Sequence, residues 1–317
     1  MRPVVRPGAA VLRRDRTSLQ IGVEPGRAVV LADSAGLREL LGRLDGLHTR
    51  DTVLKACADR KLAADTLERL VFAGVVVDAD LIRCAPAPSE LAHLLGHHSG
   101  QRANREVRAR AAATVGLVAA DGDGCELLVI IGELLVGSGV GRLMASDEVA
   151  GRVRRRDASA WRHTLPAQNP PPEVAVLVGS PVTGPDTEAL VAAGIPHLAL
   201  SLVDGIAAVG PFVQPGATAC VACVDETLAR RDPAWPVLVD QLRPANRQPA
   251  VSTDVSQPRN RVLEAAVSAL AVRELLAHLA GSTVLTLGAS LRLDASLVQQ
   301  VVHRWTLHPA CGCSLLA

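Results

Sequence analysis

Cys220-Val221-Ala222-Cys223 and Cys311-Gly312-Cys313 are the stretches of sequence that decide this fold. Each places two thiols on the same side of a turn, and a set of four cysteine ligands is common in structural zinc sites. About 87 residues separate the two pairs, so a shared ion would close a large loop and hold the end of the chain against the body of the fold. We therefore predict a structural zinc ion at Cys220, Cys223, Cys311 and Cys313, which would stabilise the fold without doing chemistry. Two separate redox pairs, or small buried apolar side chains, are the alternative interpretations.

The composition limits the class of protein. A length of 317 residues favours two domains, and a formal net charge of +1 gives no strong field for nucleic acid or a membrane surface. No apolar run reaches the ~20 residues of a membrane span. The other cysteines, Cys57, Cys84 and Cys125, have no evident partners, and residues 1–7 lack the apolar core of a signal peptide. We expect a cytoplasmic protein with neither nucleic-acid nor membrane partners.

The first 83 residues show short strands followed by helices. Apolar segments at 9–13, 19–23 and 28–31 are separated by charged or Pro-Gly turn sequences, which is typical of strands. Helical spacing of apolar residues follows, and helix starts are expected at three places: Asp33 or Ser34, Thr49 or Asp51, and Asp65 or Ala64. A closing strand is expected at 75–77. This order predicts a winged-helix domain over residues 1–83, and residues 84–106 are expected to form a linker with some helix.

A winged helix can bind DNA or a peptide. Basic and acidic residues nearly cancel here, and no helix has a one-sided basic face, which argues against DNA. An extended peptide can instead add to an open sheet edge and lie against a helix. We expect such a groove between the third helix and the strand formed by Ala28, Val29, Val30 and Leu31. A domain used only for packing is the remaining alternative.

The second predicted domain, residues 107–317, has an α/β pattern. The continuous apolar run at 126–132 predicts a buried parallel strand. Gly137, Gly139 and Gly141 follow, and strand-like sequence resumes at once at 142–145, which leaves little room for the helix that would bind phosphates. ATP binding is therefore not expected. Asp147 lies near the position where an acidic residue would bind a ribose.

The rest of this domain alternates between strands and helices. Strands are expected at 174–178, from 197 and at 207–209, and a long helix at 261–279. The polar, proline-rich segment at 224–260 is expected to be a loop.

Several motifs together resemble a known family. They are Ile195-Pro-His-Leu, Asp204-Gly, Gly210-Pro-Phe-Val-Gln-Pro-Gly-Ala-Thr-Ala-Cys220-Val-Ala-Cys223, Asp232-Pro-Ala-Trp-Pro and His308-Pro-Ala-Cys311-Gly-Cys313. Over roughly residues 107–317 the chain resembles the bacteriocin-cyclodehydratase, ThiF-type branch of the ubiquitin-activating-enzyme superfamily. The resemblance implies a Rossmann-like domain, and its zinc site carries over to the two cysteine pairs.

The resemblance also implies a function. Members commonly carry an N-terminal winged-helix RiPP recognition element, which residues 1–83 resemble. Such a protein would bind the leader of a ribosomal precursor peptide and present the core to a YcaO-type cyclodehydratase. The short glycine spacing then suggests a pseudoenzyme, a non-catalytic scaffold without adenylation. An ATP-dependent adenylating enzyme that activates a carboxylate and a DNA-binding regulator remain the alternatives, and a homodimer is implied by the resemblance alone.

Overall fold

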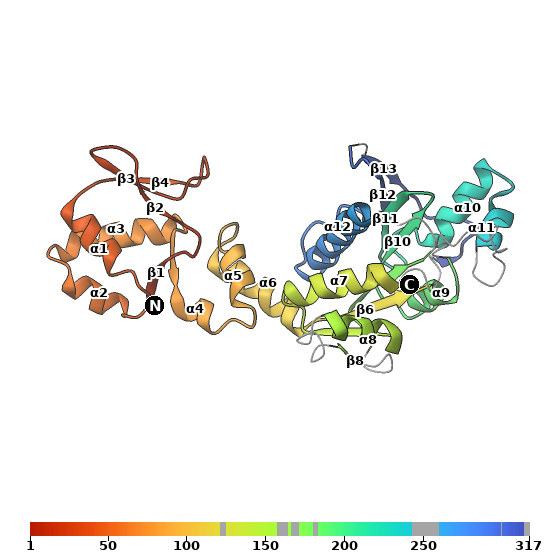
Figure 1. The fold of residues 1–317 in the computed structure, drawn as a ribbon, viewed down its shortest axis with the longest axis horizontal. Helices are drawn as coiled ribbons and strands as arrows, with labels where there is room; N and C mark the ends of the chain where they lie inside the picture. Colours follow the sequence, from red (N-terminus) through yellow and green to blue (C-terminus); the bar gives the residue numbers. More distant parts are fainter. Residues whose placement is uncertain are drawn as a thin grey trace. The chain divides into compact units, whose positions relative to one another are not determined.

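The chain is described by a computed structural model that covers residues 1–120, 125–156, 164–165, 171–179, 183–242, 260–298 and 300–313. It divides into unit 1, Met1–Ala109, and unit 2, Arg110–Ala317 (Figure 1). No helix among these residues combines the length and the apolar character needed to cross a membrane.

Unit 1 begins with a small sheet and three helices. Its strands are β1 (Pro3–Val5), β2 (Val11–Arg13), β3 (Ser18–Ile21), β4 (Val29–Ala32) and β5 (Val76–Asp78). Strands β2, β3 and β4 form an antiparallel sheet in that order, and β1 pairs with β5. The helices are α1 (Ala35–Gly42), α2 (Arg50–Ala56) and α3 (Arg60–Phe72). Buried side chains of β3, β4 and all three helices share one core, which includes Ile21, Leu40 and Leu67.

Polar side chains fix the starts of these helices. The side-chain oxygens of Ser34 and Thr49 accept hydrogen bonds from the backbone N–H groups of the first helical turns, and each is one of the two residues predicted for its helix start. The predicted start of the third helix at Asp65 is wrong, because Asp59 accepts the N–H of Leu62 and the helix begins at Arg60. The extra turn brings Leu62 onto the helix surface.

The segment predicted as a linker, residues 84–106, is mostly helical. It contains α5 (Pro88–Leu94) and the start of α6 (Gly100–Ala112), and α4 (Ala79–Arg83) precedes it. Leu91, Leu95 and Ala103 are among the buried side chains of a small separate core that this segment helps to form. The segment therefore belongs to the folded part of unit 1.

Unit 2 is built on one mixed sheet. Within the described residues its eight strands lie in the order β13-β12-β11-β10-β9-β6-β7-β8. They are β6 (Thr114–Ala119), β7 (Arg142–Ala145), β8 (Thr164–Leu165), β9 (Val174–Val178), β10 (His197–Val203), β11 (Ile206–Val213), β12 (Ala289–Asp294) and β13 (Gln300–Arg304). Strands β10 to β8 run parallel, and β11, β12 and β13 extend the sheet antiparallel. The strands predicted at 174–178, from 197 and within β11 are confirmed.

Helices surround this sheet. They are α7 (Cys125–Gly137), α8 (Asp147–Arg156), α9 (Pro185–Ala192), α10 (Val221–Arg231), α11 (Trp235–Leu242) and α12 (Arg261–Leu279). Helix α12, predicted at 261–279, packs against α7, β10 and β11 over the main core of the unit. Residues of β9, β10, α9 and α10 form a smaller cluster that includes Leu177, Ala199 and Val221.

The strand predicted at 126–132 is wrong. These residues lie in helix α7, and the preceding strand is β6, from Thr114 to Ala119. Helix α7 is buried on several sides, since Leu127, Leu128 and Val129 are each at most 4% exposed. A helix without a polar face has no helical periodicity for sequence analysis to detect.

The interpretation of the glycines is wrong for the same reason. Gly137 is the last residue of α7, and Gly139 and Gly141 lie between α7 and β7. The helix therefore precedes these glycines, whereas a phosphate-binding helix would follow them. Gly141 has a packing role, because a Cβ there would lie 1.9 Å from the backbone oxygen of Ala111. Gly122 and Gly124, which lie outside the described residues, are the glycines between β6 and α7 in the sequence.

The loop expected at 224–260 is also wrong over its described first part, where α10 and α11 form. Asp232 ends α10, and its side chain then accepts the backbone N–H of Ala234 ahead of α11. Pro236 falls in the first turn of α11, where a missing N–H costs no helical hydrogen bond. Residues 243–259 lie outside the described residues.

Candidate functional site

The cysteine thiols predicted to bind a metal come together in unit 2. The Sγ atoms of Cys220, Cys223, Cys311 and Cys313 all lie within 4.8 Å of one another. The Cys220–Cys311 and Cys223–Cys313 sulfur pairs are each 3.4 Å apart, and the Cys220–Cys223 pair is 3.8 Å apart. Sulfurs around a tetrahedral zinc ion with Zn–S distances of ~2.3 Å would be about 3.8 Å apart. The spacing and the soft donors fit a metal such as zinc.

Local structure places each pair of thiols. Cys220 is the N-cap of α10, so Cys223 lies in the first turn of that helix. After β13, the backbone N–H of Cys311 donates to the carbonyl of His308 at 3.0 Å, which forms a turn. Gly312 adopts a φ of 71°, a conformation that glycine takes without strain. The cluster therefore joins the start of α10 to the chain that follows β13.

Burial controls the thiol pKa values. It raises the pKa of Cys220 and of Cys313 to about 11, and that of Cys311 to about 12. For Cys223, burial also acts to raise the pKa, but hydrogen bonds outweigh it and the pKa is lowered; the strongest comes from the backbone N–H of His308 at 3.3 Å. Because metal-bound cysteines are thiolates, a cation here would supply the charge that stabilises the deprotonated form.

Unit 1 contains an open strand beside a groove. Among the described strands β4 pairs with β3 alone and so forms an edge of its sheet. A cavity of about 240 Å³ lies between β4, α1 and α3. Leu31 and Ala32 of β4, Leu37 of α1, and Leu62 and Thr66 of α3 are among its lining residues. The contribution of α1 was not predicted, although the short spacing between the strand and Ser34 places α1 directly after β4.

The predicted peptide-binding residues lie at this edge. Ala28 directly precedes β4, and Val29, Val30 and Leu31 belong to it. The side chain of Leu31 enters the core, with 7% exposed, whereas that of Val30 is 44% exposed. The strand therefore has a buried face that fixes it and an exposed face that a second chain could contact.

The hydrogen-bond alternation shows which backbone groups face outward. The N–H of Asp33 donates to the carbonyl of Thr17 at 2.8 Å, one step beyond the Ala32–Ser18 pair of the ladder. Hydrogen-bonded and non-hydrogen-bonded pairs alternate in antiparallel sheets. The N–H and C=O groups of Val30 and Ala32 therefore point away from β3, toward the position of an added strand.

The edge of the sheet where a nucleotide would bind carries a carboxylate at the start of a helix. Helix α7 begins just after residues 121–124, and the side chain of Glu126 lies in its first turn. Glu126 forms ion pairs with Arg152 of α8 at 3.7 Å and Arg261 of α12 at 3.3 Å, and only 13% of its side chain is exposed. A carboxylate at a helix N-terminus occupies the region of positive potential that an anionic phosphate would use. Asp147 begins α8 directly after β7.

Comparisons with known proteins show the fold of the chain. Neither a protein-family model nor the sequence of a curated protein matches it. Its structure is similar to Escherichia coli MccB crystallised with ATP (TM-score 0.59, 12% identity, 98% of this chain and 99% of that one). It is equally similar to the microcin C7 biosynthetic enzyme MccB in complex with N-formylated MccA (TM-score 0.60, 11% identity, 98% and 99%). A heterocyclase in complex with substrate and cofactor gives a TM-score of 0.63 at 14% identity, over 98% of this chain but 39% of the heterocyclase. At these identities the likeness establishes a mixed α/β fold of the MccB type, consistent with the predicted Rossmann-like, ThiF-type architecture.

Proposed function

We propose that this protein is a non-catalytic peptide-binding scaffold, which binds the leader of a ribosomal precursor peptide and presents its core to a YcaO-type cyclodehydratase. The observation that carries the proposal is the outward-facing edge of β4 next to the groove formed with α1 and α3. An extended peptide would add to β4 through main-chain hydrogen bonds and place alternate side chains in the groove. In this proposal residues 1–83 form a winged-helix RiPP recognition element, and zinc at the four cysteines stabilises unit 2.

The similar structures support a peptide partner. One of them holds MccB with the peptide MccA, and another holds a heterocyclase with its substrate. The fold of this chain matches MccB over 99% of its length and the heterocyclase over 39% of its length.

Two features of unit 2 support the absence of adenylation. The first turn of α7 contains Glu126, whose carboxylate pairs with Arg152 of α8 and Arg261 of α12. Both lysines of the chain, Lys55 and Lys61, lie in unit 1, so unit 2 has no lysine to place on a triphosphate.

Peptide binding is tested with the full-length protein. Short peptides encoded beside the gene are labelled with a fluorophore, and binding is followed by anisotropy. Saturable binding by one of them, competed by its unlabelled N-terminal half, supports the proposal. If these peptides bind only through their C-terminal halves, leader recognition is refuted.

ATP-dependent adenylation of a carboxylate is the second candidate. Helix α7 follows directly after a segment that contains Gly122 and Gly124, which is the order of a nucleotide-binding strand–loop–helix, and one similar structure is MccB with ATP. Thermal unfolding with ATP and Mg²⁺, together with pyrophosphate exchange, distinguishes the two candidates. We expect no rise in Tm and no exchange; exchange that depends on a peptide carboxylate would establish the enzyme instead.

A further inference from the structure

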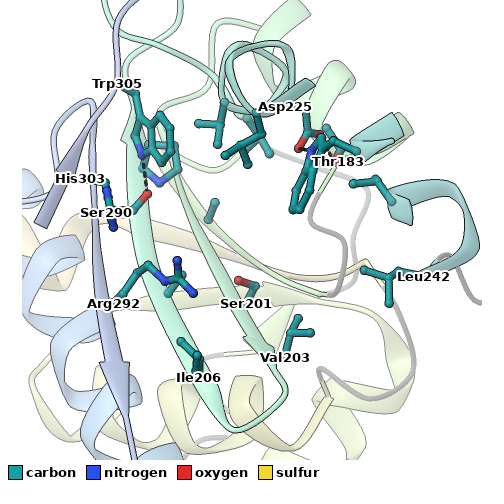
Figure 2. A pocket seen from close by; sticks show the side chains of 18 of the residues that line it. Thr183, Ser201, Val203, Ile206, Asp225, Leu242, Ser290, Arg292, His303 and Trp305 are labelled. Carbon is teal, nitrogen blue, oxygen red and sulfur yellow. Dashed lines mark hydrogen bonds between the residues drawn. The ribbon is translucent and has the colours of Figure 1, made fainter. Parts of the chain in front are cut away.

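Unit 2 contains a second and larger cavity, of about 690 Å³ (Figure 2). It lies between the antiparallel half of the sheet, β10 to β13, and the helices α10 and α11. This volume is within the range of small-molecule pockets in proteins. None of the predicted metal or peptide residues lines it.

Strand alternation explains why this face of the sheet is hollow. Leu198, Leu200 and Leu202 of β10 point to the main core under α12. The alternate residues Ala199 and Ser201 point to the cavity. Neighbouring strands also place small residues on the cavity face, namely Ala208 and Gly210 of β11 and Ser290 of β12. Small side chains in the floor leave space that larger ones would fill.

Two tryptophans line the cavity. The chain has only three tryptophans, two phenylalanines and no tyrosine, and Trp235 and Trp305 both line this cavity. The indole N–H of Trp305 donates to Ser290 Oγ at 2.8 Å, and its ring stacks with that of His303 at a centroid distance of 6.0 Å. The indole N–H of Trp235 donates to Asp225 Oδ1 at 3.0 Å. Both rings are held in place and offer flat apolar surfaces.

The charged side chains around the cavity differ in whether they already have hydrogen-bond or ion-pair partners. Arg292 of β12 lies in one cross-strand row with Ser201 and Ala208, and it makes no ion pair with any residue that the structure describes. Asp225 is already satisfied, because its second carboxylate oxygen accepts the hydroxyl of Thr183 at 2.6 Å. Figure 2 shows Arg292 and Asp225 on opposite sides of the cavity. Arg231 and Asp204 also line the cavity, so its lining carries equal numbers of arginine and aspartate side chains. This balance of charge favours a monoanion over a phosphate with two charges.

We propose that this cavity binds a small carboxylic acid with a flat apolar body. The apolar body lies against Trp235 and Trp305, above the floor of small residues. The carboxylate accepts hydrogen bonds from the guanidinium of Arg292, whose planar donors match a carboxylate. This site is separate from the groove of β4 and does not depend on the peptide-binding proposal.

The test uses the full-length protein and three aryl carboxylates of increasing length: benzoate, phenylacetate and 3-phenylpropionate. Each is titrated calorimetrically beside its uncharged amide. We expect at least one acid to bind with a millimolar or lower dissociation constant, and its amide to bind at least about tenfold more weakly, since a hydrogen bond to a charged partner is lost. If no acid binds, or if acid and amide bind equally, the proposal is refuted.

Variants locate the site. Arg292→Gln should weaken the acid at least about tenfold and leave the weak binding of the amide unchanged. Arg304→Gln, on the neighbouring strand β13 and outside the cavity lining, is the matched control and should change neither. Ser201→Leu fills the floor and should abolish binding of both compounds, with Tm confirming that the variant is folded. Equal effects of Arg292→Gln and Arg304→Gln would show that the acid binds elsewhere and overturn the assignment.

Discussion

Replacing Val30 by proline tests peptide capture at β4 directly. The N–H of Val30 points away from β3, so proline removes no hydrogen bond of the folded protein, and proline is tolerated on an edge strand. A peptide strand added to β4 would lose the hydrogen bond from the N–H of residue 30, which is worth about 0.5–1.5 kcal/mol. The peptide carbonyl that would accept this bond would be left unpaired, at a cost of about 1–3 kcal/mol. The affinity for the peptide should therefore fall by about 2–3 kcal/mol, or roughly 30- to 150-fold.

The opposite edge of the same sheet provides the control. Val11 of β2 is 43% exposed, against 44% for Val30. Its N–H also points away from β3, because the neighbouring Gly22 N–H donates to the Ala10 carbonyl at 2.9 Å. Val11→Pro should lower stability as much as Val30→Pro and leave peptide affinity unchanged. Anisotropy titrations and thermal unfolding of both variants decide the question. Equal affinities in the two variants would refute binding by strand addition at β4.

Three further predictions concern unit 2. Cys313→Ser should release bound zinc and lower the free energy of unfolding by about 4 kcal/mol or more, as for loss of a structural metal. Cys84→Ser, at an exposed cysteine, should change neither the zinc content nor the stability. Metal analysis measures the zinc content, and denaturant titration measures the stability. Gly141→Ala should destabilise the fold by about 2–3 kcal/mol because its Cβ would meet the backbone of α6, while Gly137→Ala, with nothing within 4 Å, should stay within about 0.5 kcal/mol; similar values for the two would contradict the packing role. Burial lowers the pKa of His197 below its usual 6.5, so the unfolded chain takes up a proton at a higher pH than the folded protein does. Stability should therefore fall as the pH drops below 6.5. His197→Phe should flatten this part of the pH–stability curve, and an unchanged curve would contradict the prediction.

The cluster of four cysteines was predictable because its signal in the sequence is local and specific. Two closely spaced thiol pairs have few uses in a chain without other paired cysteines. Cys220 and Cys313 could therefore be predicted to lie in one cluster although they are far apart in the sequence. The edge strand was predictable for a related reason, since a short run of Val and Leu between turn sequences is typical of a strand. In both cases a short segment contains most of the information.

The errors arose where tertiary context decides. The apolar residues of α7 look like those of a buried strand because helix α12 and the sheet cover them on several sides. The length of the run, from Cys125 to Gly137, was the available signal, since 13 residues exceed a typical strand. Gly141 could not be interpreted from sequence, because its close neighbour, Ala111, belongs to the preceding helix α6. The cavity lined by Trp235 and Trp305 was missed although two tryptophans in so aromatic-poor a chain were a visible clue.

Trp305 lies between the cluster of cysteines and the large cavity of unit 2. Its side chain packs against the cluster of buried cysteines and also lines the large cavity. Strand β13, which leads into it, is paired on one side only within the described sheet. A metal bound to the cysteines would hold the ring on one side, and a ligand in the cavity would hold it on the other, so both should favour the same arrangement of the ring. Thermodynamic linkage then requires that metal occupancy and cavity occupancy strengthen each other by the same factor.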